Sequence, residues 1–368
     1  MIRVLHSVYG MNRGGLETFI MNVYRNIDRT KVQFDFLVRT QQKCDYDDEI
    51  FSLGGNIYYA PSRSQGLRKS IKKTDEFFQD HKEYKIVHFH LSSLSNVSTL
   101  RIAKKNGVPC RIVHSHNTRQ GGSPIHKYLH LFNQMFIRSY ATDFFACSEL
   151  AAKWMYPKKI FEDHEFKIIY NGIEPEKFAL NNDIRKRKRE ELGIVDEFIV
   201  GHIGRFHPQK NHVFLIDIFK EIHKKIENVK LLLVGDGDLR PLIEKKVEEF
   251  GLTNNVIFTG VRSDIPELLQ VMDVFVFPSL YEGLGIVLVE AQASGLKCFT
   301  SDIVVPKEVN ISGLVQFVSL NESAQFWAEE ILKYKDYKRS RTTDVIINAG
   351  YDIRKIAEEL QEWYESKI

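Results

Sequence analysis

Two carboxylates in the stretch "YEGLGIVLVE", residues 281–290, are the residues of this chain best placed to do chemistry. Glu282 opens the stretch and Glu290 closes it, and an apolar run lies between them. A helix from Gly285 to Ser294 would be apolar nearly all round, which is typical of a buried helix. A buried carboxylate must be paired, hydrogen-bonded or protonated, so Glu290 needs a partner.

A vicinal diol is a suitable partner for Glu290, because its two hydroxyls, like the 2′- and 3′-hydroxyls of a ribose, can both donate to one carboxylate. On a continuous helix the two carboxylates would lie about 12 Å apart, so Glu282 would reach another part of the same ligand. We expect the backbone N–H groups of Gly283, Leu284 and Gly285 to face phosphate or sugar oxygens. The alternative is a salt bridge in the core, to Arg205 or Lys210.

A basic pair lies in the loop "RFHPQKN", which follows the predicted strand "FIVGHIG" and opens a helix. Free N–H groups and the helix dipole attract anions at such a junction. Arg205 adds a planar fork and Lys210 a point charge, which together suit a diphosphate. The alternative is a pair of solvated cations.

A glycine pair, Gly14 and Gly15, precedes the first predicted helix and is a second phosphate candidate, because glycines allow a ligand to approach the backbone closely. An ordinary flexible turn is the alternative. The sequence "LVGDGDLR" contains Gly235 and Gly237, but Arg240 stands where a dinucleotide fingerprint requires Gly or Ala, so we interpret it as a tight turn.

Alternate histidines end two predicted strands, His88 and His90 in one and His114 and His116 in the other. Alternate histidines can bind a metal, but no carboxylate or cysteine cluster follows either pair, so we expect no metal. His116 is the last of its strand and is best suited to a cleft.

Short β-rich runs alternate with helical patterns along both halves of the chain, which is typical of parallel sheets with helices on both faces. The sequence predicts an α/β protein of two doubly wound, Rossmann-like domains facing each other across a cleft. We place the first domain at 1–177 and the second at 178–352, with a final amphipathic helix at 353–368 packing back on the first.

Ligands of such sheets bind beyond the carboxyl ends of the strands. Several candidates for substrate binding fall there: Asn117 and Asn171 in the first half, and Val261 and Arg262 in the second.

Composition indicates a globular protein, with 43% hydrophobic and 27% charged residues in a chain of 368. The sequence shows neither a secretory signal nor a bilayer-spanning run, and its four cysteines form no CxxC pair, so we expect a cytoplasmic protein with reduced thiols. Residues 1–175 hold 25 Lys/Arg against 17 Asp/Glu. This excess, including "RKSIKK" at 68–73, favours contact with an anionic membrane or a polyprenyl-phosphate acceptor, and a solvated surface is the alternative.

These motifs together resemble the retaining glycosyltransferases of family 4 (glycosyltransferase group 1), which have the GT-B fold. The resemblance covers nearly the whole chain, and its most specific part is the Glu-x7-Glu spacing of Glu282 and Glu290. Arg205 and Lys210 match the family's basic pair, and His116 matches its cleft histidine in position. Gly14 and Gly15 resemble its first-domain glycine loop, and "YNGI" at 170–173 its interdomain junction.

The resemblance implies that Glu290 holds the donor ribose and Glu282 contacts the transferred sugar. Arg205 and Lys210 would stabilise the departing diphosphate, and His116 would position sugar or acceptor. The resemblance also implies that the co-substrate is a nucleotide-diphosphate sugar. By frequency in the family, the expected nucleotide is uridine diphosphate. The resemblance further implies a glycan or lipid-linked acceptor in surface polysaccharide synthesis, and neither a metal nor a nucleic acid.

Three other classes of protein are alternatives to a glycosyltransferase. A nucleotide-sugar epimerase of the same fold would release free sugar and use no acceptor. A dinucleotide dehydrogenase requires a complete GxGxxG, which this chain lacks. A non-enzymatic nucleotide-sugar-binding protein would not require the basic pair.

Overall fold

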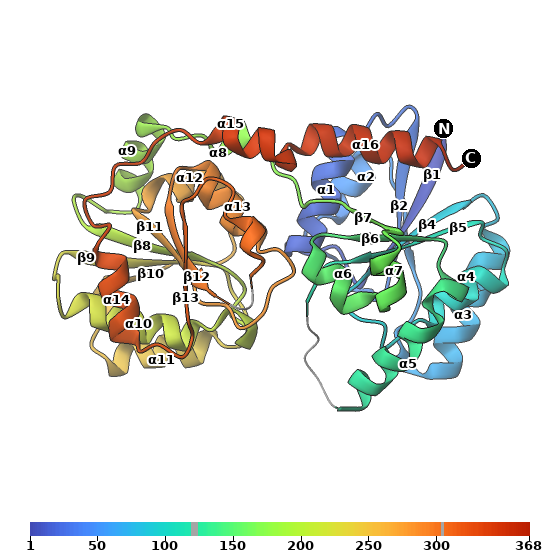
Figure 1. The fold of residues 1–368 in the computed structure, drawn as a ribbon, viewed down its shortest axis with the longest axis horizontal. Coiled ribbons are helices and arrows are strands. Elements are labelled where there is room, and N and C mark those ends of the chain that lie inside the picture. Colours follow the sequence, from blue (N-terminus) through green and yellow to red (C-terminus); the bar gives the residue numbers. More distant parts are fainter. Residues whose placement is uncertain (119–123, 303–304) are drawn as a thin grey trace. The chain divides into compact units, whose positions relative to one another are not determined.

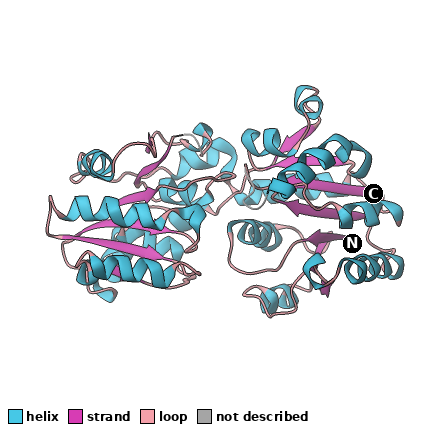
Figure 2. Cartoon of the chain, turned by 90° about the horizontal axis from the view of Figure 1, so that it is seen from below, coloured by secondary structure: helices cyan, strands magenta, loops and turns pink. Residues whose placement is uncertain are grey.

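The computed structural model describes residues 1–118, 124–302 and 305–368, and the chain forms two compact units. Unit 1 comprises Met1–Ile173 and Asp352–Ile368, and unit 2 comprises Glu174–Tyr351. In each unit helices lie on both faces of one sheet (Figures 1 and 2). Both units are therefore doubly wound α/β domains, as the alternating pattern predicted.

Unit 1 has a seven-stranded parallel sheet in the order β3-β2-β1-β4-β5-β6-β7. Its strands are β1 (Ile2–Ser7), β2 (Val32–Val38), β3 (Ile57–Tyr59), β4 (Ile86–Leu91), β5 (Cys110–Ser115), β6 (Asp143–Ala146) and β7 (Phe166–Ile168). Its α-helices are α1 (Gly15–Asn26), α2 (Asp47–Ser52), α3 (Leu67–Asp80), α4 (Ser98–Lys105), α5 (Pro124–Tyr140), α6 (Glu149–Met155), α7 (Lys158–Glu162) and α16 (Ile353–Glu365).

Unit 2 has a six-stranded parallel sheet in the order β10-β9-β8-β11-β12-β13. Its strands are β8 (Phe198–Ile203), β9 (Val229–Val234), β10 (Val256–Phe258), β11 (Val274–Phe277), β12 (Lys297–Ser301) and β13 (Val315–Val318). Its α-helices are α8 (Pro175–Phe178), α9 (Asn182–Glu191), α10 (His212–His223), α11 (Arg240–Glu249), α12 (Ile265–Val271), α13 (Ile286–Ala293), α14 (Ala324–Leu332) and α15 (Thr343–Ile346), and η2 (Pro208–Lys210) is a 3-10 turn.

The last helix, α16, completes unit 1 rather than unit 2. Its buried side chains recur at helical spacing and include Ile356, Leu360 and Tyr364, which belong to the same core cluster as Phe19 of α1 and Phe34 of β2. The chain returns to unit 1 through a backbone hydrogen bond of 2.8 Å from Ile353 N–H to the carbonyl of Ile173. An amphipathic last helix thus forms part of the core of the first unit.

The boundary between the units lies between Ile173 and Glu174, whereas the sequence analysis placed it after residue 177. The difference is the short helix α8, which packs against α12 and α13 of unit 2. Pro175 starts this helix with a fixed φ, so the chain is already part of unit 2 there.

All four cysteines are buried and free, as expected for reduced core thiols. Among the described residues, no helix combines the length and the apolar composition needed to cross a membrane.

Candidate functional site

Arg205 lies on a loop of unit 2 that is held by close backbone contacts. The loop after β8 meets the loop after β9, where Phe206 N–H donates to the carbonyl of Asp236 at 2.9 Å. A Cβ atom at Gly235 would lie 2.2 Å from the carbonyl oxygen of Gly204, so no larger residue fits there. Gly235 N–H in turn donates to the carbonyl of Gly260 after β10. Three strand ends are therefore joined around Arg205, whose side chain is exposed.

Lys210 and Glu282 form an ion pair, with Lys210 Nζ 2.7 Å from Glu282 Oε1. Their side chains are 19% and 8% exposed, so this pair is largely withdrawn from water. The lysine ammonium also lies 4.5 Å from the ring centre of Phe277. Backbone and side-chain bonds fix the two segments together, because Gln209 donates to the carbonyl of Tyr281 and accepts at its own carbonyl from Leu280 N–H. The core salt bridge considered for Glu290 is thus made by Glu282.

Glu290 lies on α13, the buried helix predicted from Gly285 to Ser294. Gly285 precedes the helix with a φ of +76°, a conformation that favours glycine. Burial raises the pKa of Glu290 to about 7, with no charged neighbour among the causes. Within the described part of the chain its carboxylate has neither an ion pair nor a hydrogen bond, so its oxygens are available to a ligand's hydroxyl groups.

The remaining candidates of unit 2 differ in their surroundings. Gly283 and Leu284 are buried beside Glu282, and Val261 is 59% exposed beyond β10. Arg262 donates to the carboxylate of Asp264 at 2.7 Å, and this contact raises the pKa of the guanidinium. Its charge is therefore engaged within the loop, unlike the exposed side chain of Arg205.

The glycine loop of unit 1 places Gly14 at the N-cap of α1 and Gly15 at its first residue. A Cβ atom at Gly14 would lie 2.3 Å from Oε2 of Glu17, so the carboxylate folds back over the loop. A phosphate at this position would meet a negative charge, which makes the loop a weaker phosphate candidate than Arg205. Two asparagines complete the set in unit 1: Asn117 accepts from Thr118 N–H, and Asn171 is buried.

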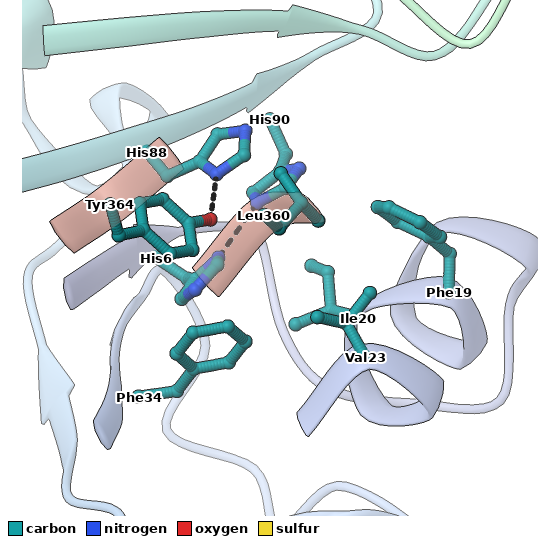
Figure 3. Close-up of a pocket in the computed structure, with 9 residues that line it drawn as sticks. All are labelled: His6, Phe19, Ile20, Val23, Phe34, His88, His90, Leu360 and Tyr364. Atoms are coloured by element: carbon teal, nitrogen blue, oxygen red, sulfur yellow. Dashed lines mark hydrogen bonds between the residues drawn. The ribbon is translucent and has the colours of Figure 1, made fainter. Parts of the chain in front are cut away.

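A hydrogen-bonded chain of histidines in unit 1 runs from His6 of β1 through His90 of β4 to His116, which directly follows β5; Figure 3 shows the His6–His90 contact. His6 Nδ1 lies 2.9 Å from His90 Nε2, and His90 Nδ1 lies 2.9 Å from His116 Nε2. A second chain joins His114 and His88 to the hydroxyl of Tyr364, which lies 2.8 Å from His88 Nδ1. A small cavity beside His6 is lined by apolar side chains, namely Phe19, Ile20, Val23, Phe34 and Leu360.

Burial keeps these histidines neutral, because it lowers the pKa of His6 and of His116 to about 3. A neutral ring has one donor and one acceptor nitrogen, so the first chain must run in one of two directions. The two ends of this chain are Nε2 of His6 and Nδ1 of His116, and both atoms are buried without a partner among the described residues. In one direction Nε2 of His6 carries the hydrogen, and in the other Nδ1 of His116 carries it. Either direction therefore leaves one buried donor without an acceptor, which is rare in folded proteins.

Two groups of three histidines bring their nitrogens within 4.8 Å of one another, namely His6, His88 and His90, and His90, His114 and His116. Such a spacing could hold a metal ion. However, nitrogens of each group face one another in hydrogen bonds, and both groups lie in apolar surroundings with neutral rings only.

Sequence reasoning missed His6 and Tyr364, since neither lies in an alternate-histidine pair. It also missed a pocket of about 260 Å³ at the carboxyl ends of β1 and β4, lined by Ser7, His90, Ser93, Asn96 and Thr99 among others. Arg39 reaches into this lining and bonds to the hydroxyls of Thr74 and Thr99 and to the carbonyl of Ala60. The available signal was strand order: the first strand of a doubly wound sheet neighbours the fourth.

Comparison with known proteins gives the family. Residues 184–352 match the family described as "Glycosyl transferases group 1", and residues 13–177 match "Glycosyltransferase Family 4". The chain is 38% identical over 360 residues to "Putative glycosyltransferase EpsF" of Bacillus subtilis (strain 168), a match that covers 96% of this chain and 94% of that protein. The chain belongs to the group 1, family 4 glycosyltransferases.

Two further proteins resemble this glycosyltransferase over its whole length. It is 29% identical over 377 residues to "Capsular polysaccharide biosynthesis glycosyltransferase CapH" of Staphylococcus aureus, covering 100% of this chain and 99% of that protein. Its fold matches the crystal structure of Anabaena Alr3699/HepE in complex with UDP and glucose, with a TM-score of 0.77, 19% identity and full coverage of both chains. Its two α/β units are thus those of the GT-B fold.

Proposed function

We propose that this glycosyltransferase moves a sugar from a uridine-diphosphate sugar to a hydroxyl of a glycan or lipid-linked acceptor, with retention of configuration, in the synthesis of a surface polysaccharide. The observation that carries the donor assignment is Glu290, a partly buried carboxylate with a raised pKa on a buried helix. The similarity to EpsF and CapH, and the UDP and glucose in the HepE structure, support the reaction class and the uridine carrier.

On the donor side, the two hydroxyls of the ribose donate to Glu290. Arg205, exposed at the joined strand ends, contacts the diphosphate and stabilises its growing negative charge. Lys210 supplies a second positive charge, and its ion pair with Glu282 fixes the direction of both side chains. The bond between the anomeric carbon and the diphosphate oxygen breaks, and the acceptor oxygen bonds to that carbon on the same face. The acceptor's proton passes to the departing diphosphate.

His116 has a positioning part in this scheme rather than that of an acid. Burial lowers its pKa to about 3, so the ring carries no positive charge near neutral pH. Its Nδ1 has no partner among the described residues, so this nitrogen is the one left to contact a sugar hydroxyl or the acceptor oxygen.

On the acceptor side, the pocket at the ends of β1 and β4 offers hydroxyl and amide groups and the guanidinium of Arg39. Burial lowers the pKa of Arg39 to about 10, and no carboxylate in the described structure pairs with it. A partly buried cation without a counter-ion favours an anionic ligand, and a phosphate of a lipid-linked acceptor meets that requirement. We therefore place the enzyme at the inner face of the membrane, where such an acceptor would be met.

The test begins with donor binding. Thermal unfolding is followed with uridine, guanosine and adenosine diphosphates, because a bound ligand raises stability by mass action. We expect uridine diphosphate to raise the melting temperature most, and the Glu290→Gln variant to lose most of that shift. If a guanosine or adenosine nucleotide is preferred, the assigned carrier is wrong.

Turnover is then measured with the matching nucleotide sugar, with and without an acceptor, before and after treatment with EDTA. We expect transfer to acceptor to exceed release of free sugar and to survive chelation. Release of free sugar independent of acceptor would instead support an epimerase or hydrolase. Loss of activity on chelation, restored by a divalent ion, would contradict a metal-free mechanism.

A further inference from the structure

The exposed face of α5 in unit 1 is unusually apolar. Seven large apolar side chains of this helix are at least 38% exposed: Ile125, Tyr128, Leu129, Leu131, Phe132, Met135 and Phe136. Six of them recur at the spacing 125, 128, 129, 132, 135 and 136, which places them along one side of a helix. We call these six residues the α5 stripe.

The side of α5 that packs on unit 1 carries polar groups instead. His130 is buried, accepts from Leu94 N–H at 3.0 Å and stacks on Trp154 with ring centres 4.2 Å apart. Asn133 donates to the carbonyl of Leu94 at 2.7 Å, and Gln134 donates to the carbonyl of Trp154. Ile137 is the other buried residue of this helix. Three polar side chains and one apolar side chain thus attach α5 to the protein, whereas most of its large apolar side chains face outward.

Charge around the stripe has one sign over a long stretch of sequence. Residues 84–142 contain no Asp or Glu, but they contain eight Lys or Arg: Lys85, Arg101, Lys104, Lys105, Arg111, Arg119, Lys127 and Arg138. Helix α4 packs beside α5, where Lys104 Nζ donates to the carbonyl of Ser139 at the end of α5. Arg138 and Lys105 pair with acidic residues from outside the stretch, whereas Lys127 is exposed next to the stripe.

We propose that the α5 stripe inserts into the interface of a bilayer rich in anionic phospholipid. An amphipathic helix with exposed Phe, Leu and Tyr on one side and basic neighbours matches the requirements of such a surface. A second copy of the chain is a poorer occupant, because a symmetric contact brings Lys127 and the other basic residues of 84–142 against their own copies. The inference deepens the membrane location within the proposed function, and lipid binding can be measured without donor or acceptor.

This assignment differs from the one that charge alone suggested. The basic segment at 68–73 lies on α3, where Lys72 and Lys73 both pair with Glu76. Helix α5 adds apolar contact that salt does not screen, so we expect binding to weaken at high salt and to persist.

The experiment is vesicle sedimentation with the full chain, using phosphatidylglycerol mixed with phosphatidylcholine, and phosphatidylcholine alone. We expect binding to the anionic vesicles and a fall of about tenfold or more in the partition coefficient for the triple variant Tyr128→Ser, Phe132→Ser, Met135→Ser. The single variant Met135→Ser, which removes one 67% exposed side chain, is measured in parallel in case the triple variant folds poorly. It should show a smaller fall in the same direction.

The matched control is the pair Val195→Ser and Leu242→Ser in unit 2, which removes apolar side chains that are 84% and 52% exposed and should leave binding unchanged. Unaltered binding of both α5 variants would overturn the proposal. So would a dimer of the parent chain that the α5 variants dissociate, combined with no vesicle binding, because a second copy would then cover the stripe. Neither result would contradict the proposed transfer reaction, because that reaction is assayed separately on a short water-soluble acceptor.

Discussion

At the scale of single residues, Glu290 gives the sharpest pH prediction. Burial raises its pKa to about 7, and only the ionised form accepts two hydrogen bonds from a ribose. Nucleotide affinity should therefore be full above pH 7 and fall up to about tenfold per pH unit below it. Glu290→Gln should lower affinity by one to two orders of magnitude, since a hydrogen bond to a charged group contributes about 1.5–3 kcal/mol.

Calorimetric titration of uridine diphosphate at several pH values measures this. The glutamine variant is also the control, because it retains the titration of the nucleotide phosphate and lacks that of Glu290. Parallel pH profiles for the parent and the variant would show that Glu290 does not bind the ribose in its charged form.

The basic pair should separate into two kinds of residue. Arg205→Ala should lower turnover about 10²-fold with little change in stability, because this side chain is exposed. Lys210→Met should lower turnover as much and also cost about 1–3 kcal/mol, because it removes the ion pair between Lys210 and the buried carboxylate of Glu282.

A double variant, Lys210→Met with Glu282→Gln, is the matched control for that effect. It should recover most of the lost stability, as measured by urea unfolding, without recovering turnover. Equal stability of Arg205→Ala and Lys210→Met would show that the Lys210–Glu282 pair does not hold the loop.

Sequence reasoning identified these residues but not their pairing. The residue types and the spacing in "YEGLGIVLVE" indicated two carboxylates with different partners. Which of them meets Lys210 depends on hydrogen bonds between Gln209 and the segment at 280–281, which join loops far apart in sequence. Such contacts leave no pattern in the sequence. Similarly, the position of Arg262 beyond a strand end suggested a ligand contact, and its partner Asp264 became evident only from the folded loop.

At the scale of elements, the neutral histidines of β1, β4 and β5 predict a stability that depends on pH. Burial lowers the pKa values of His6 and His116 to about 3, and those of the other three well below their usual value. Unfolded histidines take up a proton near pH 6.5, so below that pH the unfolded chain binds more protons than the folded one. The free energy of unfolding should fall by up to about 1.4 kcal/mol per pH unit for each histidine.

Glu290 acts in the opposite direction in part of this range, because its raised pKa favours the folded chain as pH falls toward 4.5. One carboxyl group opposes five histidines, so the net effect is loss of stability in acid. Urea unfolding at about pH 7.5, 6.5 and 5.5 measures the slope, and His6→Asn should flatten it by about one proton. Equal slopes for the parent and this variant would contradict the prediction.

Elements were more predictable than their order in space. The helix from 285 to 294 has a nearly continuous apolar run, and the final amphipathic helix has periodic apolar residues; both form close to their expected bounds. His6 was not recognised, because its neighbour His90 comes from a strand more than eighty residues away. Periodicity describes one element at a time, and strand order depends on the whole sheet.

At the scale of the whole molecule, the two units depend differently on the end of the chain. Ile353, Ile356, Leu360 and Tyr364 of α16 are buried in unit 1, and each contributes about 1.5–3 kcal/mol. Their sum is comparable with the total stability of a domain, about 5–15 kcal/mol. A chain that ends at residue 351 should therefore lose the folded form of unit 1 and keep that of unit 2.

Limited proteolysis with mass spectrometry checks this, together with nucleotide binding, which is assigned to unit 2. The truncated chain should yield a protected fragment near 174–351 that still binds uridine diphosphate. Protection of residues 1–173 in the truncated chain would show that α16 is dispensable.

The position of α16 also has a consequence for synthesis. Multidomain proteins made on the ribosome usually fold from the amino-terminal domain onward. Here the first unit cannot close its core until residues 352–368 have left the exit tunnel, and the whole of the second unit precedes them in the sequence. We infer that the nascent chain presents the open side of its first sheet, including Phe34 and the histidines, while its second unit folds. The interval between the synthesis of the first sheet and the emergence of α16 is the period when this protein is most exposed to aggregation and to chaperones.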